Sequence, residues 1–174
     1  MSRFLDRLEP AYNLILAFFI WLVAISIGLF ALLIPLNLLL VKMQWGSIWW
    51  LNEGIEYSLY AGVFLGAPWV LQQGAHVRVD IVISALPKRL ATLLEATIDT
   101  GGAVLCLVLA YYGWRAAVSE FVDGTLPDKD LRIPNWIMMA VFTVSLALLA
   151  IEFAFRIRRA RQLVEEQSSA TDGL

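Results

Sequence analysis

Residues 14–34, with the sequence LILAFFIWLVAISIGLFALLI, form an uncharged apolar run. A helix needs about 20 mainly apolar residues to cross the hydrocarbon core of a membrane. The apolar character extends over Tyr12–Val41, where Asn13, Pro35 and Asn37 are the interruptions. A cleaved signal peptide would have a shorter apolar centre, of about 7–15 residues, followed by a small-residue cleavage site. We therefore interpret this run as a membrane span of the mature chain.

The composition of the whole chain also indicates a membrane protein. Of its 174 residues, 60% are hydrophobic and 16% are charged, whereas a soluble domain is about 45–50% apolar and about 25% charged. This excludes a soluble enzyme, a secreted module and a disordered adaptor, and the net charge of −2 gives no indication of nucleic acid as a partner. The single cysteine, Cys106, excludes an intramolecular disulfide and a cysteine-based metal site. The single histidine, His76, excludes a bis-histidine haem within this chain.

Three further apolar segments predict membrane-spanning helices. They cover Trp50–Leu71, Leu90–Trp114 and Pro134–Phe155. A backbone exposed to lipid must satisfy its own hydrogen bonds, which favours helices. We predict an all-α integral membrane protein with four transmembrane helices in a single domain, residues 1–160. A polar tail that frays from the last helix is expected over residues 161–174.

Two shorter helices are also expected, one at the membrane surface after the first span and one before the third span. Pro35 removes a backbone donor and clashes with the preceding turn, so we expect a kink or a break of the first helix there. A break would leave Leu36–Met43 as an interfacial helix. Asp80 is placed to cap a short helix over Ile81–Leu86, before the third span.

The lysines and arginines are distributed unevenly between the two sets of loops. Nine of the 13 lie before the first span, between the second and third spans, or after the fourth span. The other four lie on the opposite side of the membrane. Cytoplasmic loops of membrane proteins carry the excess of positive charge. Both termini are therefore predicted to face the cytoplasm.

Charged side chains within a span are costly, so each one is a candidate for function. Glu53 and Glu56, at the outer end of the second span, are candidates for pairing with Lys42 or with a partner chain. Glu95 and Asp99 lie four residues apart on one face of the third span. We interpret them as interfacial carboxylates that face solvent or a partner. A proton relay or a cation site at these two residues is the alternative.

Two further patterns predict side-chain contacts, the first within one helix and the second between helices. Glu152 lies four residues before Arg156, near the inner end of the fourth span, which predicts an interfacial ion pair. Small residues at intervals of four allow helices to approach closely in lipid. Such a series occurs in the second span at Ser58, Gly62 and Gly66, and its candidate counterpart in the third span is Gly101-Gly102-Ala103. The partner of this face is either another helix of the chain or a second protein.

The segment between the second and third spans, residues 65–87, has the sequence LGAPWVLQQGAHVRVDIVISALP. His76, Arg78 and Asp80 alternate with valines in it. One histidine and one aspartate are too few for a zinc site, which needs three or four ligands, and no serine or cysteine is placed as a nucleophile. Arg78 can reach a lipid phosphate or a carboxylate. On their chemistry alone, these three residues are interpreted as structural.

This pattern resembles the small membrane subunit, the DctQ family component, of tripartite ATP-independent periplasmic (TRAP) transporters. The four-span layout is similar to that family over nearly the whole chain. The matching features are Asn52-Glu53 at the start of the second span, Phe64-Leu65-Gly66-Ala67 within it, Gly74-Ala75-His76-Val77-Arg78-Val79-Asp80 and Leu86-Pro87 after it, and Ile133-Pro134 with Trp136 at the start of the fourth span.

The resemblance implies a multi-pass transport subunit of the bacterial inner membrane, without catalytic activity or a cofactor. In that family, a periplasmic protein captures the substrate, commonly an organic acid or other carboxylate, and a large membrane subunit moves it inward with a sodium gradient. The small subunit braces the large one. The expected partners are the large TRAP membrane subunit, the periplasmic solute-binding protein and phospholipid, with no nucleic acid. The candidate subunit-assembly residues are Glu53, Glu56, Gly62, Gly66, His76, Arg78 and Asp80.

Two other functions are open at this point. The first is a membrane anchor subunit of a redox or quinone-linked complex, in which His76 would ligate a haem together with a residue of a partner. The second is a stand-alone carrier that uses Glu95 and Asp99 as proton sites. The chain lacks the broken-helix, inverted-repeat pattern that is typical of such carriers.

Overall fold

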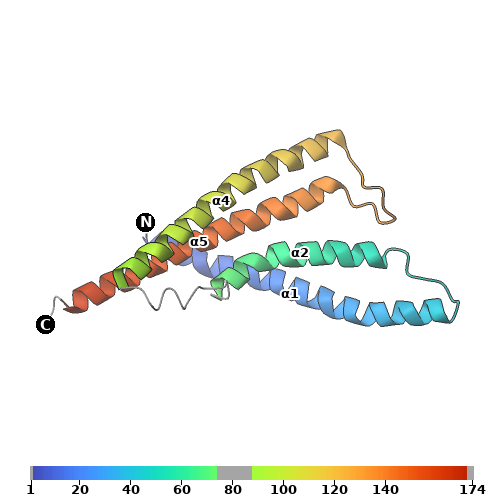
Figure 1. The fold of residues 1–174 in the computed structure, drawn as a ribbon, viewed down its shortest axis with the longest axis horizontal. Coiled ribbons are helices and arrows are strands. Elements are labelled where there is room, and N and C mark those ends of the chain that lie inside the picture. The colour runs from blue at the N-terminus through green and yellow to red at the C-terminus, as the bar shows by residue number, and fades with distance from the viewer. Residues whose placement is uncertain (1, 74–87, 172–174) are drawn as a thin grey trace.

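The computed structural model describes residues 2–73 and 88–171, and these segments form four helices (Figure 1). They are α1 (Ser2–Lys42), α2 (Leu51–Gln72), α4 (Lys88–Asp123) and α5 (Asn135–Thr171). The predicted all-helical class is therefore confirmed. His76, Arg78, Asp80 and the short helix expected over Ile81–Leu86 lie outside the described residues.

Helix α1 continues through Pro35, so of the two predicted alternatives the break, with its separate interfacial helix over Leu36–Met43, is wrong, whereas the kink stays a prediction. Pro35 removes one backbone hydrogen bond, whereas ending a helix leaves four carbonyl groups without partners inside the helix. In a membrane, each unsatisfied backbone group costs several kcal/mol. One continuous helix with a single missing hydrogen bond therefore has the lower free energy.

The turn after α1 reverses the chain direction. Gln44 and Gly46 have φ angles of 59° and 112°, in the left-handed region that a tight turn requires. The Oδ1 atom of Asn37 accepts a hydrogen bond of 2.7 Å from the backbone N–H of Ile48, which ties the loop back to α1. As a result, α2 runs antiparallel along α1 (Figure 1).

The four helices form two antiparallel pairs, α1 with α2 and α4 with α5 (Figure 1). The pairs meet at the end where α1 begins and α5 ends, and they diverge toward the other end. Helix α5 contacts both α4 and α2, so it is the central element. One apolar cluster joins α2, α4 and α5 through Leu71, Cys106, Leu146, Ala150 and Phe153. A second joins α1 and α5 through Tyr12, Leu16 and Phe155.

Three helical segments of the described chain are long and apolar enough to cross a membrane. They are Glu9–Lys42, Leu93–Asp123 and Asn135–Arg159. Helix α2 begins and ends one residue later than the segment predicted as the second span, and its crossing of the membrane stays a prediction. Helix α5 runs to Thr171 and so includes most of the segment 161–174. The predicted division of the chain into a transmembrane domain, residues 1–160, and a polar tail, residues 161–174, also stays a prediction.

Candidate functional site

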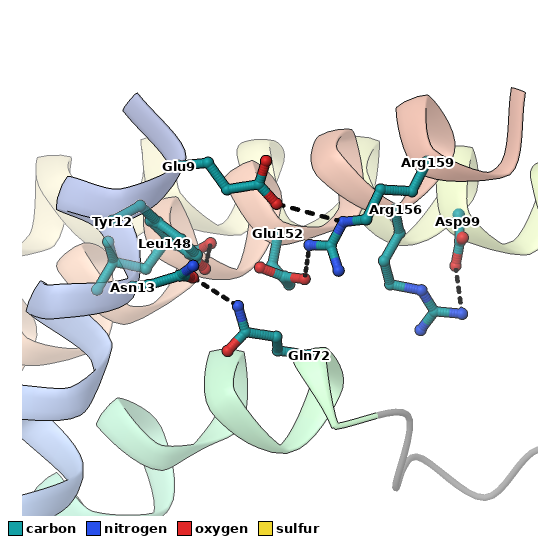
Figure 2. A network of polar contacts seen from close by, with 9 residues as sticks. All are labelled: Glu9, Tyr12, Asn13, Gln72, Asp99, Leu148, Glu152, Arg156 and Arg159. Atoms are coloured by element: carbon teal, nitrogen blue, oxygen red, sulfur yellow. Dashed lines mark hydrogen bonds and ion pairs between the residues drawn. The ribbon is translucent and has the colours of Figure 1, made fainter. Parts of the chain in front are cut away.

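A network of polar side chains lies where the two helix pairs meet (Figure 2). We call it the polar junction. It consists of Glu9, Tyr12 and Asn13 from α1, Gln72 from α2, Asp99 from α4, and Glu152, Arg156 and Arg159 from α5. Every described helix contributes at least one side chain. Polar contacts of this kind add to small-residue packing in fixing how helices associate in lipid.

Glu152 is the most deeply buried member of the polar junction. Its side chain is 0% exposed, and its Oε1 atom accepts a hydrogen bond of 2.8 Å from Nη2 of Arg159. Nε of Arg159 lies 3.6 Å from Oε1 of Glu9, so one guanidinium interacts with carboxylates from α5 and α1. The predicted Glu152–Arg156 pair is wrong. Residues seven apart lie on the same helix face, so Arg159 is also within reach of Glu152.

Arg156 instead connects α5 to α4. Its Nη2 atom lies 3.4 Å from Oδ1 of Asp99, which is 5% exposed. The expectation that Asp99 faces solvent or a partner is therefore wrong, because α5 covers it. Glu95, one turn earlier in α4, is partly exposed. The structure thus places the two carboxylates of the candidate ion or proton site in different environments.

Three contacts between uncharged groups complete the polar junction. The hydroxyl of Tyr12 donates a hydrogen bond of 3.1 Å to the backbone carbonyl of Leu148. Its ring meets that of Phe155 edge to face, with centroids 5.4 Å apart. Nε2 of Gln72 donates a hydrogen bond of 2.7 Å to Oδ1 of Asn13 (Figure 2). These contacts connect α1 to α5 and to the last turn of α2.

A second set of contacts joins the first half of α2 to the loop that follows α4 and to the start of α5. We call it the outer clasp. It consists of Glu56, Tyr57 and Tyr60 with Lys129, Leu131 and Met138. Nζ of Lys129 lies 2.7 Å from Oε1 of Glu56 and 5.2 Å from the centroid of the Tyr57 ring. The hydroxyls of Tyr57 and Tyr60 donate to the backbone carbonyls of Leu131 and Met138, at 3.3 Å and 3.2 Å.

The outer clasp also changes the acid–base behaviour of Lys129. The hydrogen bond to the Glu56 carboxylate raises the pKa of the Lys129 ammonium above its usual value. Glu56 therefore pairs with Lys129 and not with Lys42, one of its two candidate partners, and its contact with a partner chain stays a prediction. Oε2 of Glu53 is buried and has no hydrogen-bond partner among the described residues. A role of Glu53 in subunit assembly stays a prediction.

Glycines allow close packing between the helices. A Cβ atom at Gly102 would lie 2.6 Å from Cζ of Phe153, so α4 approaches α5 closely at this point. A Cβ atom at Gly62 would lie 3.2 Å from Cγ1 of Val23 in α1, whereas one at Gly66 would meet nothing within 4 Å. Gly62 thus packs inside the chain, and Gly102 faces α5 rather than the small-residue series of α2.

Several residues of these contacts were not predicted from the sequence. Arg159 could have been found from its spacing of seven from Glu152. Tyr57 and Tyr60 share a helix face at a spacing of three, which is a weaker signal. Lys129 lies in a loop, where no periodic pattern applies. Among the described residues, no three His, Cys, Asp or Glu side chains are grouped so that they could hold a metal ion.

The chain shows a clear similarity to known transport proteins. The family described as "Tripartite ATP-independent periplasmic transporters, DctQ component" matches residues 41–163, which include α2, α4 and most of α5. The chain belongs to the DctQ family. It is also 22% identical to the "C4-dicarboxylate TRAP transporter small permease protein DctQ" of Vibrio cholerae serotype O1. That similarity covers 76% of this chain, and the chain spans 66% of the length of the relative.

Membership of the DctQ family makes the chain a component of a transport system. With three helical segments suited to crossing a membrane in the described residues, this agrees with a multi-pass protein of the inner membrane. The DctQ family is a family of transport subunits and not of enzymes. A membrane anchor of a redox or quinone-linked complex is therefore not favoured.

Proposed function

We propose that the protein is the small permease subunit of a TRAP-type secondary transporter, where it braces the large membrane subunit. The transport itself would be sodium-driven, binding-protein-dependent uptake of an organic acid or a similar carboxylate. The match to the DctQ family over residues 41–163 carries this proposal. The word dicarboxylate in the name of the Vibrio cholerae relative supports a carboxylate solute.

A brace has to keep its own helices in fixed positions, and the contacts between the described helices support this role. The polar junction connects α1, α2, α4 and α5 at one end, and the outer clasp connects α2 to the start of α5 near the other. Between them, the Ser145 hydroxyl donates to the backbone carbonyl of Phe64, from α5 to α2. The buried acids Asp99 and Glu152 both pair with arginines of α5. Both carboxylates therefore form ion pairs within the chain.

The proposed arrangement in the membrane has four crossings, with α2 as the second. The start of α1 and the end of α5 lie at the same end of the molecule (Figure 1), as an even number of crossings requires. The distribution of Lys and Arg assigns that end to the cytoplasm. The polar junction would then lie near the cytoplasmic boundary and the outer clasp near the periplasmic one.

The proposed contacts with the large subunit involve the segment around His76, Arg78 and Asp80, with Glu53 and Gly66 as further candidates. An arginine in the lipid boundary needs a carboxylate or a phosphate as partner. Removing one member of a desolvated charge pair at an interface costs about 2–5 kcal/mol, largely because the other charge is left unpaired. A neutral histidine contributes one hydrogen bond, with a net value of about 0.5–1.5 kcal/mol.

The test is co-expression with the large membrane subunit, followed by measurement of complex yield and of uptake per assembled complex. Arg78→Ala and Asp80→Ala should lower the yield of complex, and total uptake should fall in proportion. His76→Ala should have a smaller effect, and Arg78→Lys, which keeps the charge, serves as the matched control. A variant that assembles fully and does not transport would contradict the brace function. Uptake by this chain alone in liposomes would also contradict it.

A further inference from the structure

Pro68 lies inside α2, where it removes one hydrogen bond from the helix. A proline has no backbone N–H, so it cannot donate to the carbonyl group four residues earlier. In α2 that carbonyl group belongs to Phe64. The side chain of Pro68 is fully buried, so this part of α2 faces other helices. A buried carbonyl group without a donor is costly, so the Phe64 carbonyl needs a donor from elsewhere in the chain.

The hydroxyl of Ser145 in α5 donates a hydrogen bond to the Phe64 carbonyl. Ser145 is 1% exposed and lies within the candidate membrane span Asn135–Arg159. A serine or threonine hydroxyl inside a helix commonly bonds back to a carbonyl group of the same helix. Other hydroxyls of the described helices do so, namely those of Ser26, Thr97, Thr100 and Thr143. Ser145 differs from them because it bonds to a second helix, at the carbonyl group that Pro68 leaves without its helical donor.

Apolar contacts hold α2 against α5 on both sides of Pro68. Before Pro68, the ring of Phe64 meets the ring of Phe142 edge to face, with centroids 5.2 Å apart. After Pro68, Leu71 is 1% exposed and belongs to the apolar cluster that α2 shares with α4 and α5. The hydrogen bond from Ser145 therefore lies between two packed parts of α2, where the helix lacks one of its own hydrogen bonds.

We propose that Ser145 positions the last turn of α2, residues 69–72, by supplying the hydrogen bond that Pro68 removes. Sharp bends in helices occur mostly at prolines, because the missing hydrogen bond joins the two sides of the helix less rigidly. The bond from Ser145 then makes α5 determine the direction of the last turn. This turn carries Gln72, which donates to Asn13 of α1 in the polar junction (Figure 2). The inference concerns the chain alone and does not rest on the proposed function.

The hydrogen bond is tested by a double-mutant cycle on the purified full chain, unfolded by sodium dodecyl sulfate in mixed micelles. Ser145→Ala should increase the unfolding equilibrium constant about tenfold, because it leaves the buried Phe64 carbonyl without a donor. Pro68→Ala returns a backbone N–H to that carbonyl, so in this background Ser145→Ala should increase the constant about threefold or less. A cavity left by Pro68→Ala is present in both members of the second comparison and cancels. Equal effects of Ser145→Ala in the two backgrounds would overturn the proposal.

Ser26→Ala is the matched control for this cycle. It is the same substitution, at a hydroxyl that donates to Val23 inside its own helix. Its effect on the unfolding equilibrium constant should be the same with and without Pro68→Ala. A coupling between Ser26→Ala and Pro68→Ala as large as that of Ser145→Ala would overturn the proposal, because the change at Pro68 would then act on the chain as a whole.

A second measurement reports the position of the last turn of α2 and not its stability. Asn13→Cys and Gln72→Cys, in a Cys106→Ser background, place two thiols where the native side chains are hydrogen-bonded at 2.7 Å. A short methanethiosulfonate cross-linker should join them several-fold more slowly when Ser145→Ala is added, and Pro68→Ala should restore the rate. Ser26→Ala should leave the rate unchanged. An unchanged rate with Ser145→Ala would overturn the proposal, as would failure of the two cysteines to cross-link when Ser145 is present.

Discussion

Replacement of Gly102 by alanine tests the packing of α4 on α5 at a point of close approach. The new Cβ atom would lie 2.6 Å, 2.9 Å and 3.0 Å from Cζ, Cε1 and Cε2 of Phe153. Carbon atoms in favourable contact are about 3.5–4.0 Å apart, so the ring would have to move by about 1 Å. Phe153 is 9% exposed and is packed against Leu71, Cys106, Leu146 and Ala150. The ring therefore has little room to move.

The neighbouring glycine provides a matched control. A Cβ atom at Gly101 would meet nothing within 4 Å, and both positions are in the interior of α4. The gain in helix propensity from Gly to Ala, about 1 kcal/mol, is therefore common to both variants. Overpacking a core costs about 1–3 kcal/mol. Gly102→Ala should thus be less stable than Gly101→Ala by about 2 kcal/mol, the middle of that range.

The assay is unfolding of the purified chain in mixed micelles by a titration with sodium dodecyl sulfate, followed by circular dichroism. Addition of Phe153→Leu to Gly102→Ala should recover part of the lost free energy of unfolding, because the smaller side chain relieves the contact. Equal stability of Gly101→Ala and Gly102→Ala would refute the reasoning, since the predicted contact with Phe153 would then have no measurable effect.

Three further predictions concern the polar contacts and the membrane topology. Arg159→Met should lower the free energy of unfolding by about 2 kcal/mol, less than the 3–5 kcal/mol typical of a fully buried pair, because Arg159 is 41% exposed. Adding Glu152→Gln should recover most of the loss, and a double variant as unstable as Arg159→Met would count against this pair. The hydrogen bond to Glu56 raises the pKa of Lys129 above 10.5, so the outer clasp contributes its stability below that pH and loses it as the pH rises through the raised pKa. The difference in Tm between the unaltered protein and Lys129→Met should therefore be equal at pH 7 and pH 9, and a decrease by pH 9 would contradict the assignment. In a Cys106→Ser background, single cysteines should react from the cytoplasmic or the periplasmic side according to the predicted topology, and periplasmic labelling at Ser84 would overturn it. The cytoplasmic positions are Ser84 and Ser168, and the periplasmic ones are Gly46 and Gly124.

The helices themselves could be predicted because their signal is local. An apolar run of sufficient length specifies a helix in lipid whatever its neighbours are. For this reason α2 differs from the predicted segment Trp50–Leu71 by one residue at each end. The break predicted at Pro35 is wrong because the local cost of the proline was considered without the cost of ending a helix in lipid. In lipid, ending α1 there would expose more backbone groups than the proline leaves unpaired.

The side-chain pairs could not be predicted in the same way, because they depend on how the helices are rotated against one another. Glu152 has Arg156 within reach at a spacing of four and Arg159 at a spacing of seven. Asp99 of α4 lies beside Arg156, which leaves Arg159 to pair with Glu152. The packing of α4 on α5 therefore determines which of the two arginines pairs with Glu152. Lys129 reaches Glu56 through a loop whose path the sequence pattern does not specify.

The brace function can be tested most directly by locking the outer clasp in the assembled transporter. Glu56→Cys and Lys129→Cys, in a Cys106→Ser background, place two thiols at partly exposed positions whose native side chains form an ion pair. A short bismaleimide would then fix α2 to the loop that precedes α5. If the small subunit is a fixed brace, the cross-linked complex should keep the uptake rate of the two single-cysteine complexes treated with the same reagent. Loss of uptake in the cross-linked complex alone would show that α2 and the loop before α5 move during transport, and would contradict the brace function.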